Sequence, residues 1–341
     1  MKHIFHHTAI ALLLVADLLV SSCTREVLPG TDTDTLTATV SLRIPQLTAS
    51  TTRAVTDTDK EQAIYTLRVI ILSTGAQSIN RLFTADDLKN GNDRLTIDNV
   101  PVGLVQMYVI ANEASIGKDY TSLSDLQADV DQVHNKLLIT DTSRLNFPKR
   151  GTIFETETTG LPMGWMNKEL TINEGTQTID ITLERQVAKL NIEMTNKLDD
   201  DITVTSISFG AFHSDRFYFF REQNLDVPDD ADYASVTFDQ VGNDNNGITI
   251  AGGTMQTMVC YVYPSFAWKD AEESSPYTIG FTTEKATYPP QTFVKNYAAL
   301  NSVIRNTQVN IYATLSKEAN VELSYSVEPW KNYTTDVPSF D

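Results

Sequence analysis

Few residues of this 341-residue chain have the types and spacing that catalysis or metal binding requires. Of its five histidines, only His134 and His213 lie beyond residue 23; the other three are His3, His6 and His7. No Ser/His/Asp order, His-x-x-x-His spacing or cysteine cluster accompanies them. Acidic turns at 199–201 and 243–247 lack the spacing of a calcium-binding EF-hand loop. The sequence therefore predicts no enzyme, no metal site and no cofactor.

The two cysteines are expected to differ in chemistry. Val20-Ser21-Ser22-Cys23 ends a short apolar run and has the pattern of a bacterial lipoprotein processing box. The signal peptide, residues 1–22, would be cut off, and acylation of the Cys23 thiol would anchor the precursor to a membrane. The alternative is an ordinary secretory signal with an incidental cysteine. Cys260 lies in an apolar strand and is expected to be a buried, inert thiol.

Arg53-Ala54 is a candidate substrate for a protease. The pair lies in a Thr/Ser-rich stretch that follows Pro45, and exposed loops of this kind are preferred cleavage sites. Arg43 is a poorer candidate because it lies inside a predicted strand. Residues 23–53 would then form a propeptide.

The stretch before this loop alternates strictly between apolar and polar residues. Its apolar members point to one side: Leu36, Ala38, Val40, Leu42 and Ile44. A period of two indicates a β-strand with one buried face. Cleavage after Arg53 would release this strand together with the membrane tether and leave an open apolar groove behind.

Length and composition indicate an all-β chain with two domains. A chain of 341 residues is long enough for two cores, and Thr, Ser, Asn and Asp are abundant between its apolar runs. Short strands separated by regular turn signals favour β-sandwiches, with one helix predicted at 123–137. The pattern changes phase near Arg185, which places the domains at 54–185 and 186–341. The net charge of −18 argues against nucleic acid as a partner.

Two alternating runs lie near the end of the chain. The apolar residues of the first are Val309, Ile311, Ala313 and Leu315; those of the second are Val321, Leu323, Tyr325 and Val327, followed by Trp330. The runs could form the last hairpin of their own domain. Alternatively, one or both could be donor strands, within 307–330, for a neighbouring molecule. The pattern alone does not separate these two interpretations.

Several motifs, in this order along nearly the whole chain, resemble the major fimbrillins of Bacteroidales-type (type V) pili. The matching segments are the box at Cys23, the strand 38–42, Arg53-Ala54, the strand 107–112 ending in Ala-Asn, Leu161-Pro162-Met163, 185–189, 304–306 with the strand 309–315, and 321–330 with its tryptophan. The resemblance implies two tandem transthyretin-like β-sandwich domains with one or two short helices.

The resemblance also implies a route of assembly. The precursor would be exported as an outer-membrane lipoprotein and cut by an arginine-specific protease, with Arg53 as the P1 residue and Ala54 as the new N-terminus. C-terminal strands of one subunit would then fill the groove of the next, in a fimbrium built from copies of itself and other fimbrial subunits. A cleavable loop together with a long strand-forming tail favours a stalk subunit over an anchor or a tip. The alternative is a monomeric surface lipoprotein that binds a glycan or host ligand through aromatic clusters at 217–220 and 261–268.

Overall fold

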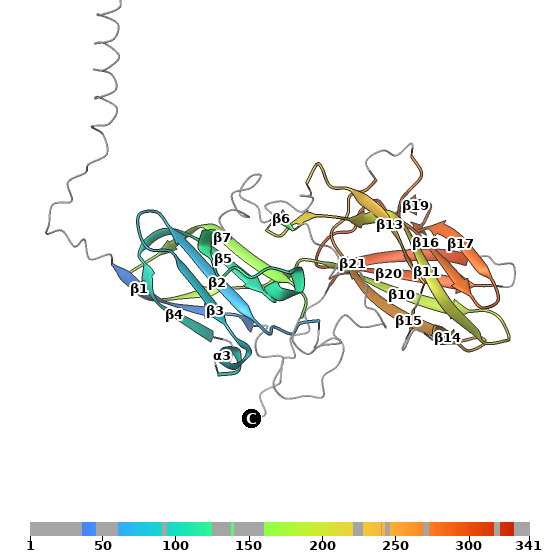
Figure 1. Ribbon diagram of the computed structural model, residues 1–341, viewed down its shortest axis with the longest axis horizontal. Helices are drawn as coiled ribbons and strands as arrows, with labels where there is room; N and C mark the ends of the chain where they lie inside the picture. Colours follow the sequence, from blue (N-terminus) through green and yellow to red (C-terminus); the bar gives the residue numbers. More distant parts are fainter. Residues whose placement is uncertain are drawn as a thin grey trace, which may run out of the picture. The chain divides into compact units, whose positions relative to one another are not determined.

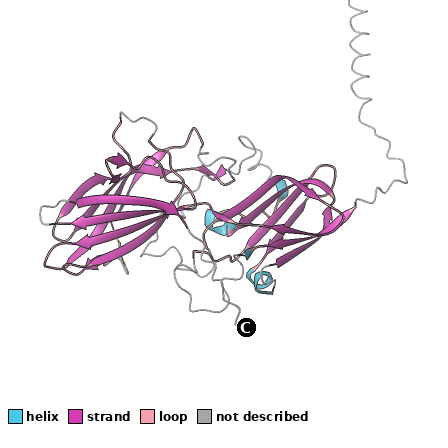
Figure 2. Ribbon diagram, turned by 180° about the vertical axis from the view of Figure 1, so that it is seen from behind, coloured by secondary structure: helices cyan, strands magenta, loops and turns pink. Residues whose placement is uncertain are grey.

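The structure is a computed structural model that describes residues 36–45, 61–90, 94–124, 138–139, 160–220, 228–239, 241–242, 246–268, 273–316 and 321–330. Strands dominate these ranges (Figure 2). The predicted signal peptide, the box at Cys23, the Arg53-Ala54 bond and nearly all of the helix predicted at 123–137 lie outside the described residues. No helix in the described ranges is long and apolar enough to span a membrane.

Two sheets form the first β-sandwich (Figure 1). The smaller sheet has the order β4-β1-β8, with β4 at Arg94–Pro101, β1 at Thr37–Arg43 and β8 at Gly175–Asp180. The larger has the order β3-β2-β5-β7-β9: Ile79–Phe83, Leu67–Ser73, Gly103–Ala111, Met163–Ile172 and Glu184–Arg185. Side chains from both sheets share one buried cluster, to which Val40, Val109 and Ile179 belong.

A second β-sandwich follows in the chain (Figure 1). One sheet has the order β15-β10-β20-β21: Met255–Val262, Ala188–Asn196, Thr307–Leu315 and Val321–Pro329. The other has the order β13-β11-β16-β17, with β14 also paired to β11: Tyr233–Phe238, Ile202–Ser214, Thr278–Thr283, Thr287–Thr292 and Ile248–Ile250. A separate buried cluster lies between these sheets, and Ile192, Phe281 and Ile311 are among its members. The predicted all-β fold of tandem β-sandwiches is confirmed.

The remaining elements are short. β6 at Leu138–Ile139 pairs with β12 at Phe217–Tyr218, and β18 at Val294–Lys295 pairs with β19 at Ala298–Ala299. A helix, α3, spans Ala85–Asn90, and a 3-10 helix, η2, spans Glu113–Ile116. The backbone N–H and the hydroxyl of Thr84 both donate to the Asp87 carboxylate, which closes the start of α3.

One strand contains residues that are typical of a turn. The pair Pro289-Pro290 has the composition of a turn, but both prolines lie inside β17. This strand is at the edge of its sheet and pairs only with β16 among the described strands. An edge strand tolerates proline because the missing N–H can face away from the ladder.

Candidate functional site

Strand β1 occupies the middle of its three-stranded sheet. It pairs antiparallel with β4, from Thr37 opposite Pro101 to Arg43 opposite Arg94. On its other side it pairs parallel with β8, from Ala38 opposite Gly175 to Arg43 opposite Asp180. Neither β4 nor β8 pairs with any other strand in the part of the chain that the structure describes. Loss of β1 would therefore leave main-chain groups unpaired on two strands at once.

The buried face of β1 agrees with the alternating pattern, but Leu36, directly before the strand, does not. Ala38 is 4% exposed, and Val40, Leu42 and Ile44 are fully buried. Leu36 is 58% exposed, so the expectation that it shares this face is wrong. Leu36 precedes the first ladder pair at Thr37, so no neighbouring strand fixes its orientation. The groove that holds β1 thus has places for the side chains of residues 38, 40, 42 and 44.

The polar face of β1 adds little to its retention. The Thr39 hydroxyl donates to the Asp98 carboxylate at 2.9 Å, and Arg43 Nε lies 2.6 Å from Asp180 Oδ1. The Arg43–Asp180 pair is exposed, and exposed ion pairs contribute about 0–1 kcal/mol. Burial of Val40, Leu42 and Ile44 contributes about 1.5–3 kcal/mol each, as an upper estimate. Apolar burial and the two hydrogen-bond ladders therefore hold β1 in place.

Strand β20 is a central core strand of the second β-sandwich. It pairs in parallel with β10 over Lys189 to Asn196, and antiparallel with β21 along its whole length. Each apolar residue predicted for its inner face is at most 1% exposed: Val309, Ile311, Ala313 and Leu315. Its removal would split the sheet and open the core.

Strand β21 is held more weakly. It is the edge strand of its sheet and pairs only with β20 among the described strands. Val321 is buried, Leu323 and Tyr325 are half-buried, and Val327 is 47% exposed. In the isolated chain the two C-terminal runs therefore form the hairpin of their own domain, with the outer strand the easier one to detach. Trp330, directly after β21, is buried in the cluster that includes the core of the first sandwich.

Most aromatic side chains of the two clusters are buried; Phe266 and Trp268 are half-buried. Phe217, Tyr218, Phe219 and Phe220 are at most 6% exposed, and Tyr261 and Tyr263 are 4% exposed. Phe217 packs against Tyr263, with ring centroids 4.4 Å apart. A glycan stacks on an accessible ring face, which the buried rings do not offer. Core packing, the default interpretation of these residues, accounts for their placement.

The residues with reactive side chains are also buried. Cys260 is fully buried, and burial raises the pKa of its thiol, as expected for an inert cysteine. His213 stacks on Phe212 with ring centroids 4.5 Å apart, and burial lowers its pKa to about 4. His134 lies outside the described residues. Within the described ranges, no group of three or more His, Cys, Asp or Glu side chains could hold a metal ion.

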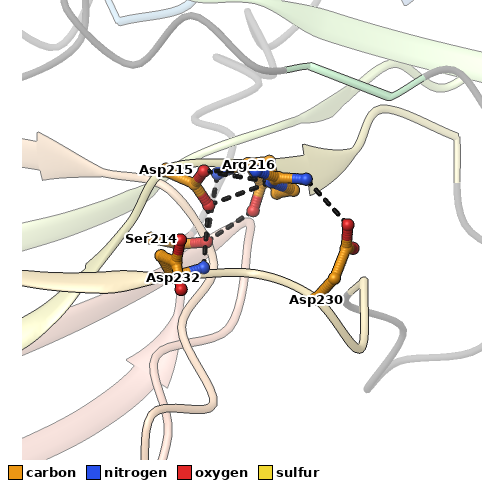
Figure 3. Close-up of polar contacts among 5 residues, drawn as sticks. All are labelled: Ser214, Asp215, Arg216, Asp230 and Asp232. Atoms are coloured by element: carbon orange, nitrogen blue, oxygen red, sulfur yellow. Dashed lines mark hydrogen bonds and ion pairs between the residues drawn. The ribbon is translucent and has the colours of Figure 1, made fainter.

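Figure 3 shows a polar cluster just after β11. Arg216 lies between two carboxylates: its Nη2 is 2.8 Å from Asp215 Oδ2 and its Nη1 is 2.8 Å from Asp230 Oδ2. The Asp232 backbone N–H donates to Asp215 Oδ1 at 3.0 Å, and the Ser214 hydroxyl donates to the Arg216 carbonyl. The guanidinium and the backbone N–H of Asp232 together join the 228–232 loop to the end of β11, which gives this cluster a structural role.

Comparisons with known proteins show a family and two solved structures that this chain resembles. Residues 38–204 match the family model described as major fimbrial subunit protein (FimA). The tip fimbrial protein Mfa3 from Porphyromonas gingivalis, with a C-terminal truncation, aligns over 86% of this chain and 99% of its own, with 14% identity and a TM-score of 0.53. A fimbrial assembly protein from Parabacteroides distasonis aligns over 86% and 96%, with 15% identity and a TM-score of 0.50. No curated protein matches the sequence. The predicted resemblance to the major fimbrial subunit family is confirmed, and the two solved structures support the fold.

Proposed function

From this family resemblance, which is to structural fimbrial proteins and not to enzymes, we propose that the chain is a stalk subunit of a surface fimbrium. It is exported as a lipoprotein acylated at Cys23, cut between Arg53 and Ala54, and polymerised by donor-strand exchange. Before cleavage it is bound to the outer membrane, and its partners are an arginine-specific protease, copies of itself and other fimbrial subunits.

The observation that carries the proposal is the position of β1 between β4 and β8. Its release exposes two unpaired strand edges beside an apolar groove, a combination that recruits another strand. An added strand supplies main-chain hydrogen bonds, and its alternate side chains fill the emptied positions. β1 is the first strand of the described residues, and Arg53 follows it in the sequence. A single cut after Arg53 would therefore separate β1 from the rest of the domain.

Cleavage acts as the switch because β1 is tethered to its own groove. A covalently attached strand competes with any incoming strand at a very high effective concentration. The uncut chain should therefore stay monomeric. Once Arg53-Ala54 is cut, β1 can dissociate and the groove becomes available.

The donor that fits best is β21. It alternates apolar residues over the same period as β1, and it loses only one ladder and a half-buried face when it leaves. β20 would lose two ladders and a fully buried face. β20 is therefore expected to stay in its sheet, at least until β21 has left.

The experiment is controlled proteolysis of the full precursor. After treatment with an arginine-specific protease, the new N-terminus should begin at Ala54, and unheated SDS gels and electron microscopy should show polymer ladders and fibres. An Arg53→Ala precursor should remain monomeric, whereas Arg43→Ala, the matched control, should be cut and polymerise normally. Cleavage at Ala54 without polymers would favour an anchor, a tip or a monomeric surface protein.

A further inference from the structure

One buried carboxylate contacts the end of the C-terminal strand. Glu61 is 3% exposed and lies a few residues beyond the Arg53 loop in the sequence. Its Oε2 accepts a hydrogen bond from the indole N–H of Trp330 at 3.1 Å. Its Oε1 accepts from the Tyr261 hydroxyl at 2.9 Å and pairs with Lys189 Nζ at 2.7 Å. A single side chain thus links β15, β10 and the residue directly after β21.

Trp330 is held on several sides. Its ring stacks on Tyr261, with centroids 5.6 Å apart and planes at 18°, and the Arg185 guanidinium lies 4.3 Å from its centroid. Its backbone N–H donates to the Asn306 carbonyl at 3.1 Å. The Arg185 Nε in turn donates to the Glu61 carbonyl at 2.9 Å. Trp330 is 6% exposed, in contrast to the half-exposed Val327 three residues earlier.

The segment that carries Glu61 is itself fixed to the first β-sandwich. The Asn112 side-chain amide donates to the Ala63 carbonyl at 2.9 Å and to the Leu161 carbonyl at 2.7 Å. The Asn112 side-chain oxygen accepts from the Tyr65 backbone N–H at 2.9 Å. These bonds do not involve β1, so they should survive its removal. Glu61 is therefore anchored independently of the strand that cleavage releases.

We propose that Glu61 is a latch that retains β21 in its own sheet by holding Trp330. The strand is weakly buried along its length, so its retention is concentrated at this end. Detachment of β21 from its C-terminal end requires that the Glu61–Trp330 contact open first. If the chain polymerises as proposed above, the latch sets how readily β21 becomes a donor; the latch itself does not depend on that function.

The test measures amide hydrogen exchange along β21 in the uncut, monomeric precursor. Trp330→Phe keeps an aromatic ring but removes the indole donor, and Glu61→Gln keeps the side-chain shape but removes the charge. Each should speed exchange of the β21 amides at least tenfold, with β10 and the strands of the first sandwich unchanged. Glu113→Gln is the matched control: Glu113 is similarly buried and binds Arg68, away from β21, so this variant should leave β21 exchange unchanged.

Two results would overturn the latch. One is wild-type exchange of β21 in both variants. The other is an equal rise in all strands of the second sandwich, which would make Glu61 and Trp330 general contributors to stability. If Glu61→Gln does not fold, the milder Trp330→Phe variant decides alone. Because the measurement uses monomers, it separates failure of the latch from failure of polymerisation.

Discussion

Burial sets the chemistry of the residues that would otherwise be the most reactive. The Cys260 thiol and the His213 imidazole both lie inside the second β-sandwich or against it, where the charged form of each is disfavoured. Burial raises the pKa of the first and lowers that of the second. Neither group is placed to act as a nucleophile or a base on an external substrate.

His213 should make the protein sensitive to acid. Its pKa falls from 6.5 to about 4 on folding, mainly because burial penalises the imidazolium. A depressed folded-state pKa gives stability that is complete above pH 6.5 and is lost as the pH falls towards 4. The difference between these two pKa values corresponds to a loss of about 3 kcal/mol in the free energy of unfolding, as an order of magnitude.

Thermal unfolding between pH 7 and pH 4.5 would measure this effect. Wild-type protein should lose stability over this interval, and His213→Gln should lose less of its own stability over the same interval. Equal pH slopes for the two proteins would contradict the assignment of the effect to His213.

At the scale of strands, one-sided burial decided which elements could be predicted from the sequence. β1, β10, β20 and β21 were recognisable because their apolar residues alternate, and the first three bury that face. β3 buries only Phe83 and β13 buries none of its residues, so one-sided burial does not mark either strand. β17 contains two prolines that look like a turn signal. The exposed Leu36 shows that alternation fixes the period of a strand but not where its ladder begins.

The contacts of Trp330 were beyond the reach of the sequence pattern. Glu61 and Trp330 are 269 residues apart, and a lone glutamate near a loop gives no signal of burial. Only the folded chain brings this carboxylate to the end of β21. Long-range pairing of this kind leaves no trace in local periodicity.

The two faces of β1 should differ in their contribution to stability. Leu42 is fully buried, so Leu42→Ala should destabilise the uncut precursor by about 2–5 kcal/mol, through lost burial and a cavity. Thr39→Ala, on the opposite face of the same strand, should change stability by about 1 kcal/mol or less because its hydrogen bond to Asp98 is exposed. Chemical denaturation of the two variants and the wild type gives both values.

The same two variants also test whether β1 is removed. Once the chain has been cut and β1 has been replaced, Leu42→Ala polymers should be as stable as wild-type polymers. A polymer weakened by this substitution would mean that β1 stays in the groove.

In the whole molecule, two strands of one chain have complementary properties. β1 fills a groove that depends on it for pairing, and β21 is an edge strand with the same apolar period. The proposed donor-strand exchange between copies would place β21 of one subunit beside β4 of another.

Disulfide trapping would detect this arrangement of β21 beside β4. Thr96 is exposed on β4 opposite Ser41, and Ser324 is exposed on β21. The chain carries just Cys23, upstream of the proposed cut, and the buried Cys260. Thr96→Cys can therefore be combined with Ser324→Cys or, for another register, with Ser326→Cys. Polymers formed after cleavage and oxidised should run as covalent multimers on heated, non-reducing SDS gels with at least one pair, and as monomers on heated, reducing gels. Polymers that form normally but stay uncrosslinked with both pairs would contradict the exchange of β21 into the β1 groove.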